Sequence, residues 1–178
     1  KTYRDFMREA YNIDFEKLYD CIASTADYIR KDNNNKTIDL LVAESFSALP
    51  TLVAAQQKSI DNVVLINPIL DWKDFFQKNE EDGYIKPREN YKAFNRVELS
   101  QDFFTTAEKM QEEVELRPLK GLFFYAGNDE YVSVELQKQA SEKLQLTPIE
   151  LSESHRLTDQ EKSQVIERIT AYLKNPQQ

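Results

Sequence analysis

The fold is decided by residues 38–47, which read IDLLVAESFS. Residues 38–42 form a short apolar run, which is typical of a strand covered on both faces of a parallel sheet. Small residues follow, and residues 48–57 return to a helical pattern, with Pro50 tolerated in the first turn. The stretch therefore predicts a strand that turns sharply into a helix, with Ser45 at the turn.

The rest of the chain alternates in the same way between short apolar runs and amphipathic segments. Further strands are expected at residues 63–66, 121–125 and, more weakly, 148–151. Helices are expected at residues 2–30, 134–144 and 159–173. Strands that alternate with helices indicate an α/β fold, in which helical crossovers connect the strands of a parallel sheet.

Residues 70–120 interrupt this alternation. The stretch is long, charged and rich in aromatic residues, and we expect it to form helical excursions outside the sheet. Its aromatic side chains could line a pocket or form the core of the excursion itself, and the pattern does not decide between the two. They include Trp72, Phe75, Phe76, Tyr84, Tyr91, Phe94, Phe103 and Phe104.

Length and composition limit the class of protein. A chain of 178 residues is expected to form one domain, and a net charge of −8 argues against nucleic-acid binding, because no basic patch can neutralise phosphates. The single cysteine excludes an intramolecular disulfide and fits a reducing compartment. No apolar run approaches the roughly 18 residues of a membrane span, and no signal peptide is visible. We expect a cytoplasmic protein without a membrane span, and nothing calls for a cofactor or a metal.

Ser45 stands where a reactive serine could stand. A serine on a strand-to-helix turn usually follows the pattern G-x-S-x-G, because small neighbours let the strand and the helix approach closely. Here Ala43 and Ser47 replace both glycines. Taken by itself, Ser45 could equally be the N-cap of the helix.

Two further residues complete the pattern. Asp129 follows the strand at residues 121–125 and could orient an imidazole, although taken by itself a helix cap or an ordinary loop aspartate is the commoner role. His155 is the only histidine of the chain, and its side chain has the unperturbed pKa that suits a base at neutral pH. Each of the three lies just past the end of a predicted strand, where reactive groups gather in parallel sheets. The order predicts Ser45 as nucleophile, Asp129 as acid and His155 as base.

These residues resemble the α/β-hydrolase superfamily. Within it, the chain is most similar to the acyl-transfer thioesterases of bacterial bioluminescence operons, which release fatty acids from acyl carrier protein. The resemblance rests on residues 43–47 (AESFS), 128–132 (NDEYV) and 154–157 (SHRL). It implies a serine hydrolase that cleaves an ester or thioester of an acyl chain, small or carrier-linked, through an acyl-enzyme. The backbone N–H of Phe46 would be one oxyanion donor. Residues 1–178 would form one α/β-hydrolase domain, and residues 70–120 lie where such hydrolases carry an inserted cap.

The resemblance also concerns what precedes the first helix. Such hydrolases have several strands ahead of it, and an early loop supplies the second oxyanion donor. We therefore expect an upstream segment or a second chain to complete the sheet against residues 38–42. The alternative is a non-catalytic hydrolase-fold module used for binding or within a larger assembly. The replaced glycines favour that alternative, and the complete set of Ser, Asp and His weighs against it.

Overall fold

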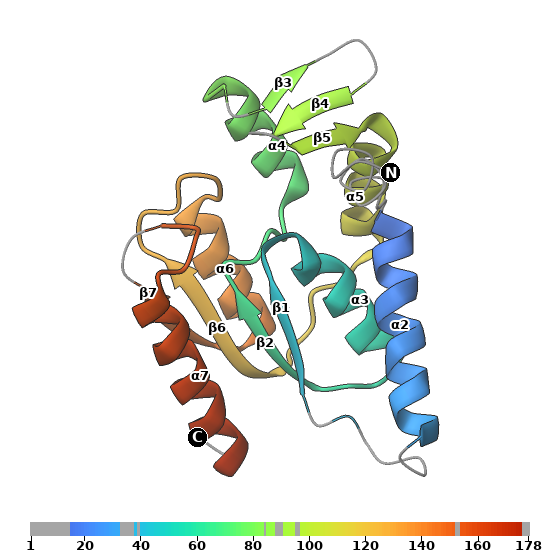
Figure 1. The fold of residues 1–178 in the computed structure, drawn as a ribbon, viewed down its shortest axis with the longest axis vertical. Helices are drawn as coiled ribbons and strands as arrows, with labels where there is room; N and C mark the ends of the chain where they lie inside the picture. Colours follow the sequence, from blue (N-terminus) through green and yellow to red (C-terminus); the bar gives the residue numbers. More distant parts are fainter. Residues whose placement is uncertain are drawn as a thin grey trace, which may run out of the picture.

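A four-stranded parallel sheet forms the centre of the molecule (Figure 1). The computed structural model describes residues 15–32, 38, 40–83, 85–87, 91–94, 97–151 and 154–175. The sheet has the order β1-β2-β6-β7, and its neighbouring strands are all parallel. The strands are β1 (Leu41–Glu44), β2 (Asn62–Ile66), β6 (Lys120–Ala126) and β7 (Thr147–Leu151). The predicted α/β fold with a parallel sheet is confirmed.

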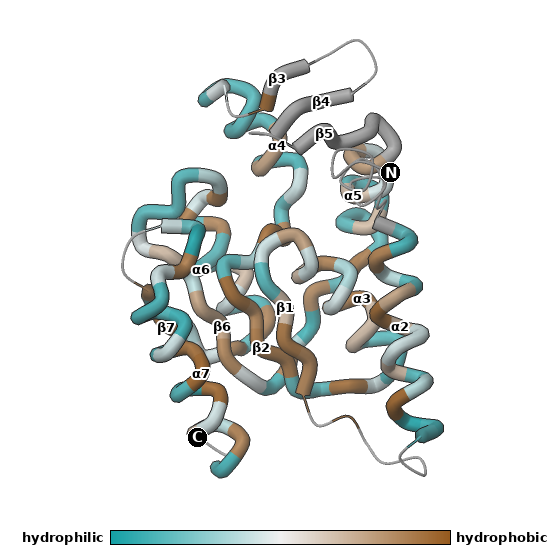
Figure 2. The backbone as a smooth tube through the Cα atoms, viewed as in Figure 1, coloured by the Kyte–Doolittle hydropathy of each residue, from teal (hydrophilic) through white to brown (hydrophobic). Residues whose placement is uncertain are grey.

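Helices cover both faces of this sheet. On one face, α3 (Ala48–Gln57) and α6 (Val134–Leu144) pack against the strands, and α2 (Phe15–Asp32) packs on α3. On the other face lies α7 (Asp159–Lys174). Apolar residues follow the central strands, whereas the helices carry many of the hydrophilic ones (Figure 2). The first predicted helix is described from Phe15, and residues 2–14 of that prediction lie outside the described residues.

Burial explains why the strands read as continuous apolar runs. In β2, Val63 and Leu65 belong to the core beneath α3, whereas Val64 and Ile66 face α7. Both sets are buried, so neither face of the strand needs polar residues. β1 differs, because it is an edge strand of the described sheet and Val42 is 52% exposed.

β1 begins and ends later than predicted. The expectation was residues 38–42, and the strand is Leu41–Glu44. Ala43 pairs with Leu65 and Glu44 pairs with Ile66, so hydrogen bonding to β2 extends the strand through residues that were read as part of the turn. The strand therefore ends directly at Ser45.

Most of residues 70–120 form a layer beyond the carboxyl ends of the strands, and the chain after residue 113 returns to the amino end of β6 (Figure 1). The expected helices are α4 (Trp72–Glu81) and α5 (Gln101–Glu113). Between them lies an antiparallel sheet that the sequence did not predict, made of β3 (Ile85–Pro87), β4 (Tyr91–Phe94) and β5 (Val97–Ser100). Strands of three or four residues are too short to show a period of two.

The aromatic residues of α4 and α5 pack on one another. Trp72 and Phe75 are fully buried, and their ring centroids lie 5.3 Å apart. Phe76 of α4 and Phe104 of α5 lie 4.3 Å apart between centroids. These rings are buried in one core cluster that also contains Val63 and Phe123 of the sheet. The Tyr84, Tyr91 and Phe94 side chains lie outside the described residues.

None of the helices in the described part of the chain is both long and apolar enough to cross a membrane.

Candidate active site

Ser45 occupies a strained turn between β1 and the helix that follows. Its φ is +53°, a left-handed value that costs a residue with a Cβ roughly 1–2 kcal/mol. Ser45 begins a single 3₁₀ turn, η1 (Ser45–Ser47), which leads directly into α3. The Ser45 carbonyl accepts a hydrogen bond from the Ile69 N–H at 3.3 Å. Strain of this kind persists only where the surroundings fix the backbone, and it is concentrated at functional sites.

The turn is closed without the usual glycines. Ala43 is buried and small enough for α3 to pack over the strand. The Ser47 hydroxyl accepts a hydrogen bond from the Glu44 N–H at 3.0 Å and donates one to the Glu44 carbonyl at 2.8 Å. The Ser47 side chain therefore links the end of the turn to its start at Glu44. Sequence reasoning missed this role.

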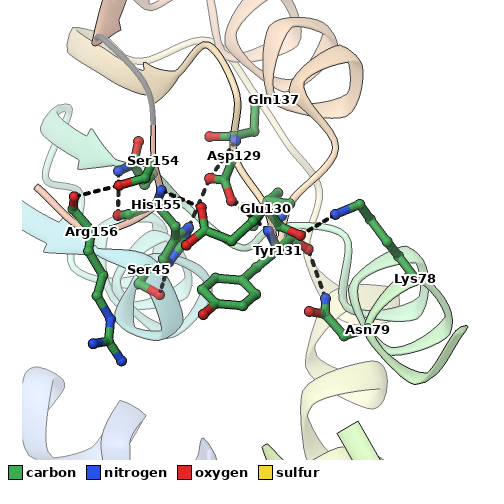
Figure 3. Close-up of polar contacts among 12 residues, drawn as sticks. Ser45, Lys78, Asn79, Asp129, Glu130, Tyr131, Gln137, Ser154, His155 and Arg156 are labelled. Carbon is green, nitrogen blue, oxygen red and sulfur yellow. Dashed lines mark hydrogen bonds and ion pairs between the residues drawn. The ribbon is translucent and has the colours of Figure 1, made fainter. Parts of the chain in front are cut away.

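The structure brings Ser45, His155 and Asp129 together in one chain of hydrogen bonds (Figure 3). Ser45 Oγ lies 2.8 Å from His155 Nε2, and His155 Nδ1 lies 2.8 Å from Asp129 Oδ2. A carboxylate only accepts, so Nδ1 carries the proton and Nε2 is left to accept from the serine hydroxyl. The Asp129 side chain is fully buried, and that of His155 is nearly so.

The Asp129 carboxylate is held from four directions. Its Oδ1 accepts from the backbone N–H groups of Tyr131 and Val132, both at 3.0 Å. Its Oδ2 accepts from the Gln137 amide at 3.2 Å as well as from His155. These four hydrogen bonds fix the orientation of the carboxylate. Gln137 lies on α6 and is 2% exposed, and no pattern in the sequence marked it.

Phe46 follows Ser45 in η1, where a hydrolase has its first oxyanion donor. Its ring joins the aromatic core of α4 and α5, with centroids 5.2 Å from Trp72 and 5.9 Å from Phe103. The Tyr131 ring packs edge-on against the His155 imidazole, with the two ring centroids 5.5 Å apart. The Phe46 ring is thus part of the aromatic cluster, and the Tyr131 ring lies against the imidazole of His155.

A cavity of about 390 Å³ lies among α4, α5 and α6. Neither Ser45 nor His155 lines it. Its lining includes the apolar Leu49, Leu116 and Leu136 and the polar Asp71, Asp74 and Gln137. Burial, and then the neighbouring Asp71 carboxylate, raise the pKa of Asp74. Among the residues that the structure describes, no three His, Cys, Asp or Glu side chains gather to hold a metal ion.

Comparison with known proteins identifies the fold. No protein-family model and no curated protein matches the sequence. A structure of the metagenome-derived lipolytic enzymes LipS and LipT superposes with a TM-score of 0.67 at 14% identity, over 92% of this chain and 75% of that one. Est1E from Butyrivibrio proteoclasticus gives 0.62 at 17% identity, over 89% and 72%. An α/β-hydrolase-fold protein from Burkholderia ambifaria gives 0.52 at 9% identity, over 83% and 70%. The chain therefore has the α/β-hydrolase fold.

Proposed function

We propose that this chain carries the nucleophile, base and acid of a serine hydrolase that cleaves an ester or thioester of an acyl chain. The observation that supports this most is the unbroken relay from Ser45 Oγ through the His155 imidazole to Asp129, with 2.8 Å at both steps. The strained φ of Ser45 adds to it, because ordinary N-cap serines do not need a left-handed backbone. The N-cap reading of Ser45 does not account for either feature.

The proposed reaction has two halves. His155 Nε2 takes the Ser45 hydroxyl proton while Oγ attacks the carbonyl carbon, and the carbonyl π electrons move to oxygen. When the tetrahedral intermediate collapses, the alcohol or thiol leaves with the proton from Nε2, and an acyl-enzyme remains. Water then attacks that ester by the same route and releases the acid. Asp129 stays ionised and stabilises the imidazolium.

The oxyanion would be stabilised by the backbone N–H of Phe46 and by a second donor. In this fold the second donor comes from an early loop ahead of the nucleophile strand. We propose that an upstream segment or a second chain supplies it and pairs with the edge of β1 that has no partner strand among the described residues. The edge position of β1 and the exposure of Val42 support this proposal.

The substrate class is proposed at two levels. The description of LipS and LipT as lipolytic enzymes favours an acyl ester. The resemblance at residues 43–47, 128–132 and 154–157 favours a thioester, with hydrolysis or acyl transfer as the outcome. A cytoplasmic location is part of the proposal, because the described cysteine, Cys21, is a free thiol.

A serine-directed fluorophosphonate probe tests the proposal. The wild-type chain, with any segment that completes its sheet, should be labelled at Ser45, and Ser45→Ala should abolish labelling. His155→Ala should slow labelling on the order of 10⁴-fold or more, because no base remains to take the proton. Ser24→Ala, at an exposed serine of α2, is the control for labelling at any other serine. Equal labelling of the wild type and Ser45→Ala would reject the nucleophile and favour the non-catalytic module.

A further inference from the structure

The backbone of His155 is held at both of its polar groups by side chains from elsewhere in the fold. His155 lies between β7 and α7, in a segment that is neither helix nor strand. Its N–H donates to Glu130 Oε2 at 2.9 Å. Its carbonyl accepts from Asn67 Nδ2 at 2.7 Å. No regular hydrogen-bond ladder places this residue, so these two contacts do.

Asn67, which donates to the His155 carbonyl, is held in place by the sheet. Asn67 follows β2, is fully buried, and has a φ of +42°. Its own N–H donates to the Phe124 carbonyl of β6 at 2.9 Å. The amide that reaches His155 therefore comes from a backbone position fixed between two central strands.

The Glu130 side is anchored in the layer formed by residues 70–120. Glu130 is the residue next to Asp129, so one turn supplies both the imidazole's acid partner and the acceptor for the His155 N–H. Two side chains of α4 hold this turn (Figure 3): Lys78 Nζ donates to the Glu130 carbonyl, and Asn79 Nδ2 donates to the Tyr131 carbonyl at 2.8 Å. Asn79 is fully buried.

We propose that Glu130 and Asn67 are positioning residues, which clamp the backbone of His155 so that its ring bridges Ser45 and Asp129. Lys78 and Asn79 connect the Glu130 side of the clamp to α4. The catalytic consequence rests on the proposed function, whereas the clamp itself does not. Displacement of a catalytic group by about 1 Å can cost about 100-fold in rate, so loss of one side should be felt in kcat.

Nuclear magnetic resonance tests the clamp without any substrate. His155 is the only histidine of these 178 residues, so a nitrogen-15 histidine label reports on this imidazole, and a His155→Ala spectrum identifies its signals if a completing segment adds other histidines. The wild type should show one far-downfield Nδ1 proton, as expected for an imidazole bonded to a carboxylate. Glu130→Ala and Asn67→Gly should broaden or abolish it. Glycine is chosen at Asn67 because it tolerates the positive φ that alanine would strain.

Two controls separate loss of the acceptor from loss of charge. Glu130→Gln keeps an oxygen that can accept the His155 N–H, and it should retain the resonance. Glu142→Ala removes an exposed carboxylate from α6 and should change nothing. If Glu130→Ala does not fold, Asn67→Gly decides. An unchanged imidazole proton in the folded variants overturns the clamp.

Kinetics supply the second readout. Glu130→Ala and Asn67→Gly should lower kcat for a simple acyl ester about 10- to 100-fold, with KM within about twofold of the wild type. Glu130→Gln should restore most of the lost rate. If the wild type shows no Ser45-dependent turnover, the proposed function fails while the resonance still judges the clamp. If the wild type turns over and both variants match it, the positioning role is wrong.

Discussion

At the residue scale, the turn that presents the Ser45 hydroxyl holds the Ser45 backbone in a strained conformation, which lowers the stability of the fold. Its backbone is left-handed, and the penalty arises from the Cβ atom, which glycine lacks. Ser47 holds the turn closed through two hydrogen bonds to Glu44. The strain therefore belongs to position 45, and a substitution there can release it.

Ser45→Gly should be more stable than Ser45→Ala. Both variants lack the hydroxyl, but alanine keeps the Cβ and so keeps a strain of roughly 1–2 kcal/mol. Glycine loses roughly 0.5–1 kcal/mol through greater freedom in the unfolded chain. Glycine should come out ahead by about 0.5–1 kcal/mol in the free energy of unfolding, measured with urea. An alanine variant that is more stable than the glycine variant by about 0.5–1 kcal/mol would mean that position 45 is not strained.

Asp129→Asn should lower kcat by roughly 10⁴ while leaving the fold intact. Oδ1 accepts two backbone N–H groups, so the amide oxygen of the variant must take that place. The side-chain NH₂ of the variant then faces His155 Nδ1, so Nδ1 must accept a hydrogen bond. The imidazole proton therefore resides on Nε2. A protonated Nε2 cannot take the proton of Ser45. The imidazole nitrogen shifts of labelled protein report this tautomer, and an unchanged tautomer would contradict the argument.

The sequence could predict the three residues of the relay and missed those that support them. Ser45, Asp129 and His155 follow the ends of strands in a fixed order, and that order is visible without a structure. Gln137 and Asn67 each donate one side-chain amide hydrogen bond to a partner on another element: Asp129 lies 8 residues from Gln137, and His155 lies 88 residues from Asn67. Pairings of that kind depend on where strands and helices meet in space, so no spacing reveals them.

At the scale of elements, α4 begins beside a pair of carboxylates. Asp71 caps the helix by accepting from the Asp74 N–H at 3.0 Å. Asp74 lies in the first turn, where a helix dipole favours negative charge. Burial, and then repulsion from Asp71, nevertheless raise the pKa of Asp74 above its ordinary value of 3.8. The ionised form of Asp74 is therefore less favourable in the folded protein than in the unfolded chain.

Asp74→Asn should stabilise the protein at neutral pH. A raised folded pKa means that ionised Asp74 costs stability above that pKa, whereas below the unfolded value of 3.8 both states are protonated and the cost is absent. The gain in Tm should be present at pH 7 and shrink as the pH falls toward about 4. Asp159→Asn, at an exposed carboxylate of α7, is the control. A gain that grows on acidification would contradict the assigned direction.

Element boundaries were predictable only where apolar runs decide them. The limits of α3 and α6 agree with the prediction, because each starts and ends at a change of composition. The sequence predicts β1 at residues 38–42, whereas the strand ends at Glu44, because Ala43 and Glu44 also pair with β2. The antiparallel sheet of β3, β4 and β5 escaped prediction because three- and four-residue strands carry no readable period.

At the scale of the whole molecule, the strands of the central sheet differ in how many neighbouring strands they pair with. β2 and β6 have neighbours on both sides, whereas β1 pairs only with β2 in the described part of the chain. Val42, in the middle of β1, is 52% exposed. An apolar edge with unpaired backbone groups is a template for pairing with another strand. β7, the other edge strand, likewise pairs only with β6 in the described part of the chain, and Ser45 follows directly on β1.

Purified by itself, the 178-residue chain should self-associate through β1, and Val42→Lys should reduce that association. A lysine on an edge strand opposes strand addition, because a second chain would have to bury its charge. Ile166→Lys is the matched control: Ile166 is an apolar residue of α7 that is 64% exposed, but a helix surface offers no backbone groups for a ladder. The expected result in light scattering across a concentration series is a lower mean mass for Val42→Lys than for the wild type or Ile166→Lys. A wild-type chain that stays monomeric at every concentration, or an equal effect of both lysines, would show that β1 is not the interface, and the proposed pairing of β1 with an upstream segment or a second chain would lose its support.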